Sequence, residues 1–430
     1  MGLTVNAVGQ VTKRGIIPRL PGPEKVLSDA QEWLRAEQAD VVRSLACAPT
    51  KSGDTELVVG LHPAAEPVSI TVSEVGHVVV TADTTSVGPG YHTYLGRLLE
   101  RLGGVLAIEW TSEEPAAHWE GTPSPLAPLQ DRTEVERSHL AWLGHLLGRM
   151  RDARRLGAAD LHAGTRAGTT FTFDGALATP LGPRSDAWLE QAAADARVAI
   201  DVRPWWADAT DARYLVNRAL TILWTEVRWR PPTEDERPAV DEALRLLRKA
   251  FPLDPTLPFP WHEWLEIITL RDLDDPIARD VAIRAERTPR SPVPVGYRRS
   301  PVTIVHAGWS LVVPGSFAER RTAEEWSGGE GGRSVTLAGT STGFEGGAPT
   351  PADSFLARVA SDLGEDVINH FDGDLVGRAR LDTDASSGVE VGVLDGFTAV
   401  PGRGAAIRVE FVDPGDWRWA VNLWRALKPA

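Results

Sequence analysis

The sequence predicts a multi-domain α+β protein, with α+β units at the two ends flanking a tryptophan-rich, mainly helical middle. Segments rich in β-branched residues gather near both ends, and helical spacing of apolar residues dominates between them. The 430 residues exceed the roughly 100–200 residues of one ordinary domain. Hydrophobic residues make up 42% and charged residues 24% of the chain, as in folded proteins.

The N-terminal part is predicted to be an arm followed by a domain. Residues 1–23 are basic at Lys13, Arg14 and Arg19 and end in closely spaced prolines, which favours an arm that packs late. We expect an α+β domain over 24–115. Its expected elements are a helix over 24–46, strands over 56–61, 68–72 and 77–82, a helix over 91–102 and a strand over 105–110.

The middle domain is expected over 129–290, after a proline-rich connector at 121–128. Its first helix, over 131–156, begins with the capping-box pattern formed by Thr133 and Glu136. Further helices are expected over 185–196, 208–227, 234–250 and 261–270.

The C-terminal domain is expected over 300–430 as a β-rich α+β unit closed by a helix. Strands are expected over 302–305, 309–313, 334–338, 375–381, 389–393 and 405–412, with helices over 351–363 and 413–427. The order strand, Thr/Ser-rich turn, Gly-rich loop and helix occurs both after residue 78 and after residue 334. This repetition makes the two end units candidates for related domains.

Composition excludes several classes of function. The net charge of -14 argues against a nucleic-acid partner, because phosphate binding relies on an excess of Lys and Arg. The single cysteine, Cys47, excludes intrachain disulfides and cysteine-rich zinc sites, which favours a cytoplasmic location. The opening residues do not resemble a signal peptide, and no apolar run reaches about 18 residues, so we expect no membrane partner. The Arg-, Ala-, Gly- and Pro-rich composition favours a bacterial source.

One loop is a candidate ligand site, because it leads directly into a predicted helix. The free backbone N–H groups at a helix N-terminus can bind anions. The alternative is that the Thr and Ser side chains of the loop simply cap the helix, since no Walker lysine or G-x-G-x-x-G pattern follows. The candidate ligand-binding residues are Thr84, Thr85, Ser86, Gly88, Gly90, Tyr91 and His92.

Three fragments resemble catalytic or metal motifs, and none is complete. Ser341 lies in a G-x-S-x-G pattern after a predicted strand, yet no helix follows at once. His262 and Glu263 begin an H-E-x-x-H pattern, in which Glu266 replaces the second histidine. Four aspartates lie in pairs at the opposite ends of one predicted strand: Asp372, Asp374, Asp382 and Asp384. We therefore assign no catalytic residue, metal or cofactor.

Tryptophan is the most unusual feature, with 16 residues in the chain. Trp and Arg are favoured at protein interfaces, whereas Trp can equally fill the space between helices and proline-rich loops. The candidate partner-binding residues are Trp205, Trp206, Trp229, Arg230, Trp261 and Trp264.

These observations favour a non-enzymatic cytosolic component that binds a protein partner or assembles with itself. One alternative is a hydrolase assembled from distant residues, which would require two or more of His92, His262, His370 and Asp372 to face one pocket. The other is a sensor of a small ligand or anion at residues 88–92.

Overall fold

The computed structural model describes residues 3–12, 20–49, 55–111, 126–158, 161–164, 169–171, 173, 175–272, 274–341, 344–345, 348–364, 366–385 and 390–430. The chain divides into two compact units. The first unit comprises residues 1–166, 173–226 and 239–295, and the second comprises residues 167–172, 227–238 and 296–430. Both units contain helices and sheets, which confirms a mixed α+β, multi-domain fold. No helix in the described part of the chain has the length and apolarity needed to cross a bilayer.

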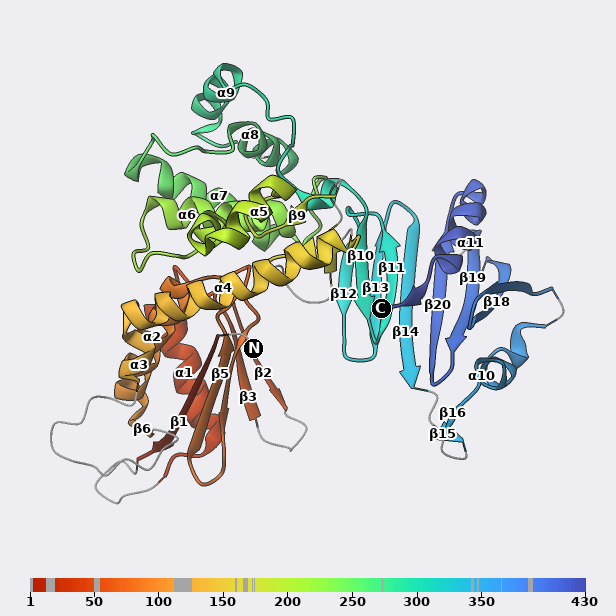
Figure 1. Ribbon diagram of the computed structural model, residues 1–430, viewed down its shortest axis with the longest axis horizontal. Coiled ribbons are helices and arrows are strands. Elements are labelled where there is room, and N and C mark those ends of the chain that lie inside the picture. The colour runs from red at the N-terminus through yellow and green to blue at the C-terminus, as the bar shows by residue number, and fades with distance from the viewer. Residues whose placement is uncertain are drawn as a thin grey trace. The chain divides into compact units, whose positions relative to one another are not determined.

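The first unit contains a six-stranded antiparallel sheet with the order β2-β3-β4-β5-β1-β6 (Figure 1). Helix α1 contacts β3 and β4, and helix α2 contacts β1 and β6. The bounds are β1 Thr4–Val11, α1 Pro23–Glu37, β2 Ser44–Pro49, β3 Thr55–Gly60, β4 Val68–Val72, β5 His77–Asp83, α2 Pro89–Leu106 and β6 Ile108–Thr111.

The start of the chain differs from the expected arm. Residues 4–11 form strand β1, which pairs with both β5 and β6 and buries Val5, Ala7 and Val11 on one face. Burial of alternate side chains on a pleated strand is the physical reason, because it places every second residue in the core. The basic residues 13, 14 and 19 lie outside the described residues.

The helix expected over 24–46 is also shorter in the structure. Helix α1 ends at Glu37, and residues 44–49 form β2, paired with β3. The apolar residues Val41, Val42 and Leu45 match helical spacing, but the chain gains ladder hydrogen bonds with β3 by adopting an extended conformation.

The rest of the first unit is mainly helical. Its elements are α3 Ala127–Gln130, α4 Arg132–Arg155, β7 Leu161–His162, β9 Leu177–Ala178, α5 Asp186–Ala194, η1 Ala196–Val202, α6 Ala212–Thr225, most of α7 Arg237–Leu253, α8 Trp261–Leu270 and α9 Ala278–Arg287. The N-cap of α4 is Asp131, whose carboxylate accepts hydrogen bonds from the backbone N–H groups of Thr133 and Glu134, at 3.1 and 3.2 Å. Asp131 therefore caps this helix in place of the expected Thr133.

The second unit is built on a seven-stranded antiparallel sheet with the order β12-β13-β14-β20-β19-β18-β17, beside a four-stranded sheet with the order β21-β11-β10-β8. The large sheet comprises β12 Ala318–Arg321, β13 Glu325–Glu330, β14 Arg333–Ser341, β17 Ile368–Asp372, β18 Leu375–Asp384, β19 Val391–Val400 and β20 Arg403–Phe411. The small sheet comprises β8 Thr169–Phe171, β10 Val302–His306, β11 Trp309–Val313 and β21 Lys428–Pro429. Other elements of this unit are η2 Tyr297–Arg299, β15 Phe344–Glu345, β16 Ala348–Pro349, α10 Ala352–Val359, η3 Ser361–Leu363, η4 Pro414–Asp416 and α11 Trp417–Arg425.

Two glycines allow the C-terminal helix to pack closely on the large sheet. A Cβ atom at Gly377 or Gly396 would lie 2.8 or 2.7 Å from the ring of Trp424, a fully buried residue of α11. The Trp424 indole N–H donates a hydrogen bond of 3.0 Å to Thr398 on β19. The proposed relation between the two end units stays a prediction, since β5 and β14 lie in sheets of different strand order.

Candidate functional site

The loop predicted to bind a ligand is held by hydrogen bonds within the first unit. The Thr84 hydroxyl donates to the Leu3 carbonyl at 2.9 Å, and the Thr85 hydroxyl oxygen accepts from the Leu3 N–H at 2.8 Å. The Ser86 hydroxyl donates to the Ala64 carbonyl. These polar groups therefore fix the loop between β5 and α2 against β1 and the segment after β3.

The N-terminus of α2 lies against the segment that contains Trp205. The Gly90 N–H donates to the Trp205 carbonyl and the Trp205 N–H donates to the Val87 carbonyl, both at 3.1 Å. A Cβ atom at Gly90 would lie 2.2 Å from the Ala207 carbonyl oxygen, and one at Gly88 would lie 2.7 Å from that of Trp205. Gly88 also has a φ of 127°, a conformation that favours glycine. Both glycines are therefore required for this close approach.

Tyr91 and His92 are buried beside this contact. The Tyr91 ring packs against Trp205 with centroids 5.8 Å apart, and burial raises the pKa of its hydroxyl. The His92 Nδ1 atom lies 2.8 Å from the Thr84 hydroxyl oxygen, and burial lowers the pKa of His92 to about 4. His92 is therefore neutral at pH 7.

An arginine not selected from the sequence lies against the same loop. Arg203 is 1% exposed, and its Nη1 atom donates to the carbonyl oxygens of Thr85 and Ser86, at 3.4 and 3.1 Å. Its guanidinium lies 5.3 Å from the ring centroid of Trp142. The Nε and Nη2 atoms of Arg203 are buried and have no hydrogen-bond partner in the described part of the chain.

The predicted partner-binding residues are divided between the two units. Trp205 and Trp264 are 1% and 0% exposed in the first unit, in the core-packing role that the sequence also allowed. Trp206 is half-buried, with its ring 6.4 Å from that of His139. In the second unit, Arg299 lies 3.6 Å above the Trp229 ring. Arg230 forms ion pairs there with Glu236 at 2.7 Å and Glu330 at 3.2 Å.

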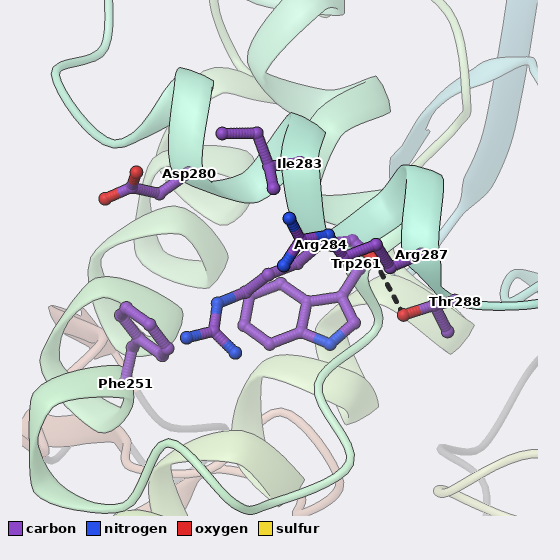
Figure 2. Close-up of a pocket in the computed structure, with 7 residues that line it drawn as sticks. All are labelled: Phe251, Trp261, Asp280, Ile283, Arg284, Arg287 and Thr288. Carbon is purple, nitrogen blue, oxygen red and sulfur yellow. Dashed lines mark hydrogen bonds between the residues drawn. The ribbon is translucent and has the colours of Figure 1, made fainter.

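Trp261, the remaining residue of that set, lines a pocket of about 430 Å³ formed by α7, α8 and α9. Figure 2 shows its aromatic rings and two arginine side chains gathered at one place. The Arg284 guanidinium lies 4.8 Å from the ring centroid of Phe251 and 5.1 Å from that of Trp261. The residues that line the pocket are Phe251, Trp261, Asp280, Ile283, Arg284, Arg287 and Thr288.

Hydrogen bonds fix the end of α9 that borders this pocket. The Thr288 hydroxyl donates to the Arg284 carbonyl at 2.8 Å, and His262 Nε2 donates to the Thr288 carbonyl at 2.8 Å. One motif candidate, His262, thus acts as a link between α8 and the end of α9. Its neighbour Glu263 is buried and accepts a hydrogen bond from the Val295 N–H at 3.1 Å.

The pocket lining carries an excess of positive charge. It contains two arginines and one aspartate, and the structure gives neither Arg284 nor Arg287 an ion pair with any residue that it describes. Both arginines are exposed. An apolar side chain also lines the pocket, since Ile283 is 38% exposed. The combination of aromatic rings, unpaired guanidinium groups and an exposed apolar side chain suits recognition of a carboxylate beside an apolar group.

The other motif candidates are not brought to this pocket. Ser341 ends β14 in register with Arg403, and residues 342–343 lie outside the described residues. The aspartate pairs 372/374 and 382/384 lie at different ends of β18. Within the described ranges, no group of three His, Cys, Asp or Glu residues has a metal-binding arrangement. None of His92, His262, His370 and Asp372 lines the pocket.

Comparison with known proteins gives no functional assignment for this chain. No protein-family model matches the chain, and no curated protein matches it. A crystal structure of a protein from Bacteroides thetaiotaomicron is 9% identical, covers 29% of this chain and 45% of that chain, and has a TM-score of 0.24. The match thus spans less than half of that protein's length. Similarity at this level carries no conclusion about fold, ligand or activity.

Proposed function

We propose that this chain is a protein-binding component, and that the α7–α9 pocket receives an acidic segment of a partner protein. The observation that carries the proposal is the position of Arg284, whose guanidinium lies over both Phe251 and Trp261 while its charge is unpaired among the described residues. Arg287 lines the same pocket and provides a second unpaired cation.

The aromatic rings favour binding because they hold Arg284 in place before a partner arrives. An arginine that stacks on rings loses less side-chain freedom when it binds a carboxylate, so more of the interaction energy remains as affinity. Trp and Arg are also the residue types that most often dominate the binding energy of an interface. The exposed Ile283, which lines the pocket, would contact an apolar side chain that flanks the acidic group.

The proposal also covers the functional class of the protein and its location in the cell. We favour a binding component over a hydrolase because the described residues that line this pocket include no Ser, Cys or His that could act as a nucleophile and base pair. The Arg-, Ala-, Gly- and Pro-rich composition supports a bacterial source. The single cysteine, the exposed Cys47, supports a location in the cytoplasm.

The test is a binding measurement with labelled peptides of matched length. A 12-residue peptide that alternates Glu with Leu serves as the probe, and its Gln-for-Glu counterpart is the control for charge. Fluorescence anisotropy should show that the acidic peptide binds wild type, and that Arg284→Gln combined with Arg287→Gln weakens binding by about tenfold or more. Arg279→Gln, also on α9 but outside the pocket lining, is the matched variant and should leave binding unchanged.

Two results with the peptides would overturn the proposal, and a third, with an oligonucleotide, would overturn the partner class. One is equal affinity of the acidic and neutral peptides for wild type, because the arginines would then not contribute. The other is an equal loss in Arg279→Gln and in the pocket variant, which would indicate a diffuse electrostatic effect. If a single-stranded oligonucleotide bound more tightly than the peptide at the same salt concentration, the partner class would be wrong.

A further inference from the structure

The β17–β18 hairpin of the second unit ends in a turn that presents an aromatic ring beside two carboxylates. Asp372 and Leu375 are the last paired residues, so Gly373 and Asp374 make the turn. Phe371 is 69% exposed, and both aspartates are exposed. Single exposed apolar side chains are common on protein surfaces, so the feature that matters here is the pair of carboxylates beside the ring.

Residues 371–374, here called the hairpin tip, have no ionic or aromatic partner among the residues that the structure describes. Neither Asp372 nor Asp374 forms an ion pair there, and the Phe371 ring packs against no other ring there. A Cβ atom added at Gly373, where φ is 59°, would meet no atom within 4 Å. The tip therefore stands clear of the described residues and carries two unbalanced negative charges.

Other exposed apolar side chains also adjoin an acidic residue, but most of those carboxylates are already engaged. The engaged carboxylates, each with the residue that it binds, are Asp254 with Thr256, Asp382 with Arg380, Asp413 with Gly415 and Asp416 with Arg333. The β4–β5 turn leaves Glu74 without an ion pair in the described ranges, beside Val75, which is 71% exposed. That turn offers one carboxylate and an aliphatic side chain, whereas the hairpin tip offers two carboxylates and a ring.

The α7–α9 pocket matches the hairpin tip in charge and in the kind of side chain. The pocket presents Arg284 and Arg287, neither of them ion-paired with a described residue, beside two aromatic rings (Figure 2). Two guanidinium groups suit two carboxylates, and the exposed Ile283 suits an aromatic ring. Asp280 also lines the pocket, so two arginines and one aspartate leave a net positive lining for a negative tip.

The hairpin tip is narrow enough to enter the pocket end-on. Paired strands lie about 4.8 Å apart, and successive side chains such as Phe371 and Asp372 point to opposite faces of a hairpin. The pocket volume of about 430 Å³ is within the range of sites that enclose small ligands, so it can receive a few side chains. End-on entry brings side chains from both faces of the hairpin against the pocket walls.

We propose that the partner of the α7–α9 pocket is a second copy of this chain, which inserts its hairpin tip. This inference rests on the proposed function of the pocket and names its partner. Asp372 and Asp374 pair with Arg284 and Arg287, and Phe371 contacts the apolar part of the lining. The contact joins two different surfaces, so it is head-to-tail, and each copy can bind two others in a ring or an open chain. Because the contact is small, we expect a Kd on the order of 10–100 µM.

The first experiment measures mass as a function of concentration. Sedimentation equilibrium of wild type between about 5 and 200 µM should show a weight-average mass that rises from that of the monomer to twice that value or more. Two variants should stay monomeric: the pocket variant Arg284→Gln/Arg287→Gln and the tip variant Phe371→Ser/Asp372→Asn/Asp374→Asn. All five substituted side chains are exposed, so the substitutions leave the cores of both units intact.

Mixing the two monomeric variants is the decisive measurement. The pocket variant keeps an intact tip, and the tip variant keeps an intact pocket, so an equimolar mixture should form heterodimers. No larger species should form, because each heterodimer has only a disabled pocket and a disabled tip left over. A mixture that stays monomeric would overturn the proposal.

A control variant tests whether the hairpin tip is the segment that binds. Glu74→Gln/Val75→Ser removes the other exposed acidic and apolar pair, and it should associate as wild type does. Loss of association in this variant would contradict the proposal. Asp372→Asn/Asp374→Asn keeps the ring and should weaken association by about tenfold, which also covers the case in which the triple variant does not fold. Unchanged association of this double variant would count against the pairing with the arginines.

The peptide measurement separates this inference from the proposed function. The tip variant keeps the pocket, so it should bind the acidic peptide as wild type does. Peptide binding by a wild type that is monomeric over the whole concentration range would leave the proposed function standing and exclude a second copy as the partner. Failure of the tip variant to bind the peptide would instead count against the proposed function of the pocket.

Discussion

Two arginines of the first unit are equally buried and differ in how their charge is balanced. Arg218 and Arg203 are each 1% exposed. The Nε and Nη2 atoms of Arg218 both donate to Glu242, and the Nε bond is 2.9 Å long. The Nη1 atom of Arg218 donates to the Tyr214 hydroxyl oxygen, also at 2.9 Å. Among the described residues, Arg203 donates to two backbone carbonyls, those of Thr85 and Ser86. The protein thus supplies the counter-ion for one arginine and, among its described residues, not for the other.

The Arg218 site also has a second arginine that shares its carboxylate. Arg43 donates to the other oxygen of Glu242 at 2.7 Å and to both oxygens of Glu226, at 3.0 and 2.8 Å. These arginines hold the pKa of Glu242 below its usual value despite the opposing effect of burial. Equal burial of the two arginines therefore accompanies two different arrangements: a shared ion network around Arg218, and two backbone hydrogen bonds from Arg203.

The largest expected effect comes from breaking the Arg218 network. Glu242→Gln leaves Arg218 without a buried counter-charge, and removal of one partner of a buried ion pair costs about 3–5 kcal/mol. We expect urea unfolding at pH 7 to show a loss of that size. The exposed ion pair between Arg155 and Glu190 provides the matched control, and Glu190→Gln should cost less than about 1 kcal/mol. Similar losses for both variants would show that the buried network contributes nothing special.

The next effect concerns two buried, neutral histidines of the first unit, His92 and His139. His92 and His139 have pKa values lowered to about 4 by burial, against 6.5 in the unfolded chain. As pH falls below 6.5, the unfolded state gains protons first, so stability is complete above pH 6.5 and is lost towards pH 4. The loss is roughly 3 kcal/mol per histidine. Urea unfolding between pH 7.5 and 4.5 should show this decline, and His139→Gln should make it shallower. An unchanged slope in His139→Gln would contradict the assignment.

The smallest effect tests the contact between α2 and the Trp205 segment. Gly90→Ala places a Cβ atom 2.2 Å from the Ala207 carbonyl oxygen and should cost about 1–3 kcal/mol. Gly104→Ala, in the same helix with no atom within 4 Å of the added Cβ, should stabilise by about 0.4–1 kcal/mol. Thermal unfolding of the two variants should therefore shift in opposite directions. Equal shifts would mean that the Gly90 contact is easily relaxed.

The fold could be predicted from the sequence where the spacing of apolar residues in a segment matched the face that the segment buries in the structure. The helix expected over 261–270 and the strands over 68–72 and 309–313 have the same bounds in the structure. The helix expected over 24–46 was wrong beyond residue 37, because the pairing of residues 44–49 with β3 is a long-range contact that local spacing does not contain. Helix α9 was not expected, since Val281 and Ala285 provide its only buried side chains.

The candidate site was harder to predict because its decisive residues carry no local pattern. Trp261 was selected from its neighbourhood in the sequence, but Arg284 and Arg287 resemble the charged positions of any exposed helix until Phe251 and Trp261 are placed beside them. Arg203 had no signal at all, since its burial depends on residues 85, 86, 142 and 164, which come from separate segments. Chain topology decides such convergence, and spacing along the sequence does not reveal it.

The position of β1 in its sheet has a consequence for biosynthesis. This strand is made before every other strand of the sheet, yet Thr4 pairs with Asp83 and Val11 pairs with Ile108. A nascent chain must therefore keep β1 unpaired on the ribosome until its partners have emerged, and the hairpins from β2 to β5 can form first. Insertion of β1 then becomes a late step that joins β5 to β6, and fusions that restrain residues 4–11 should slow the folding of the whole sheet.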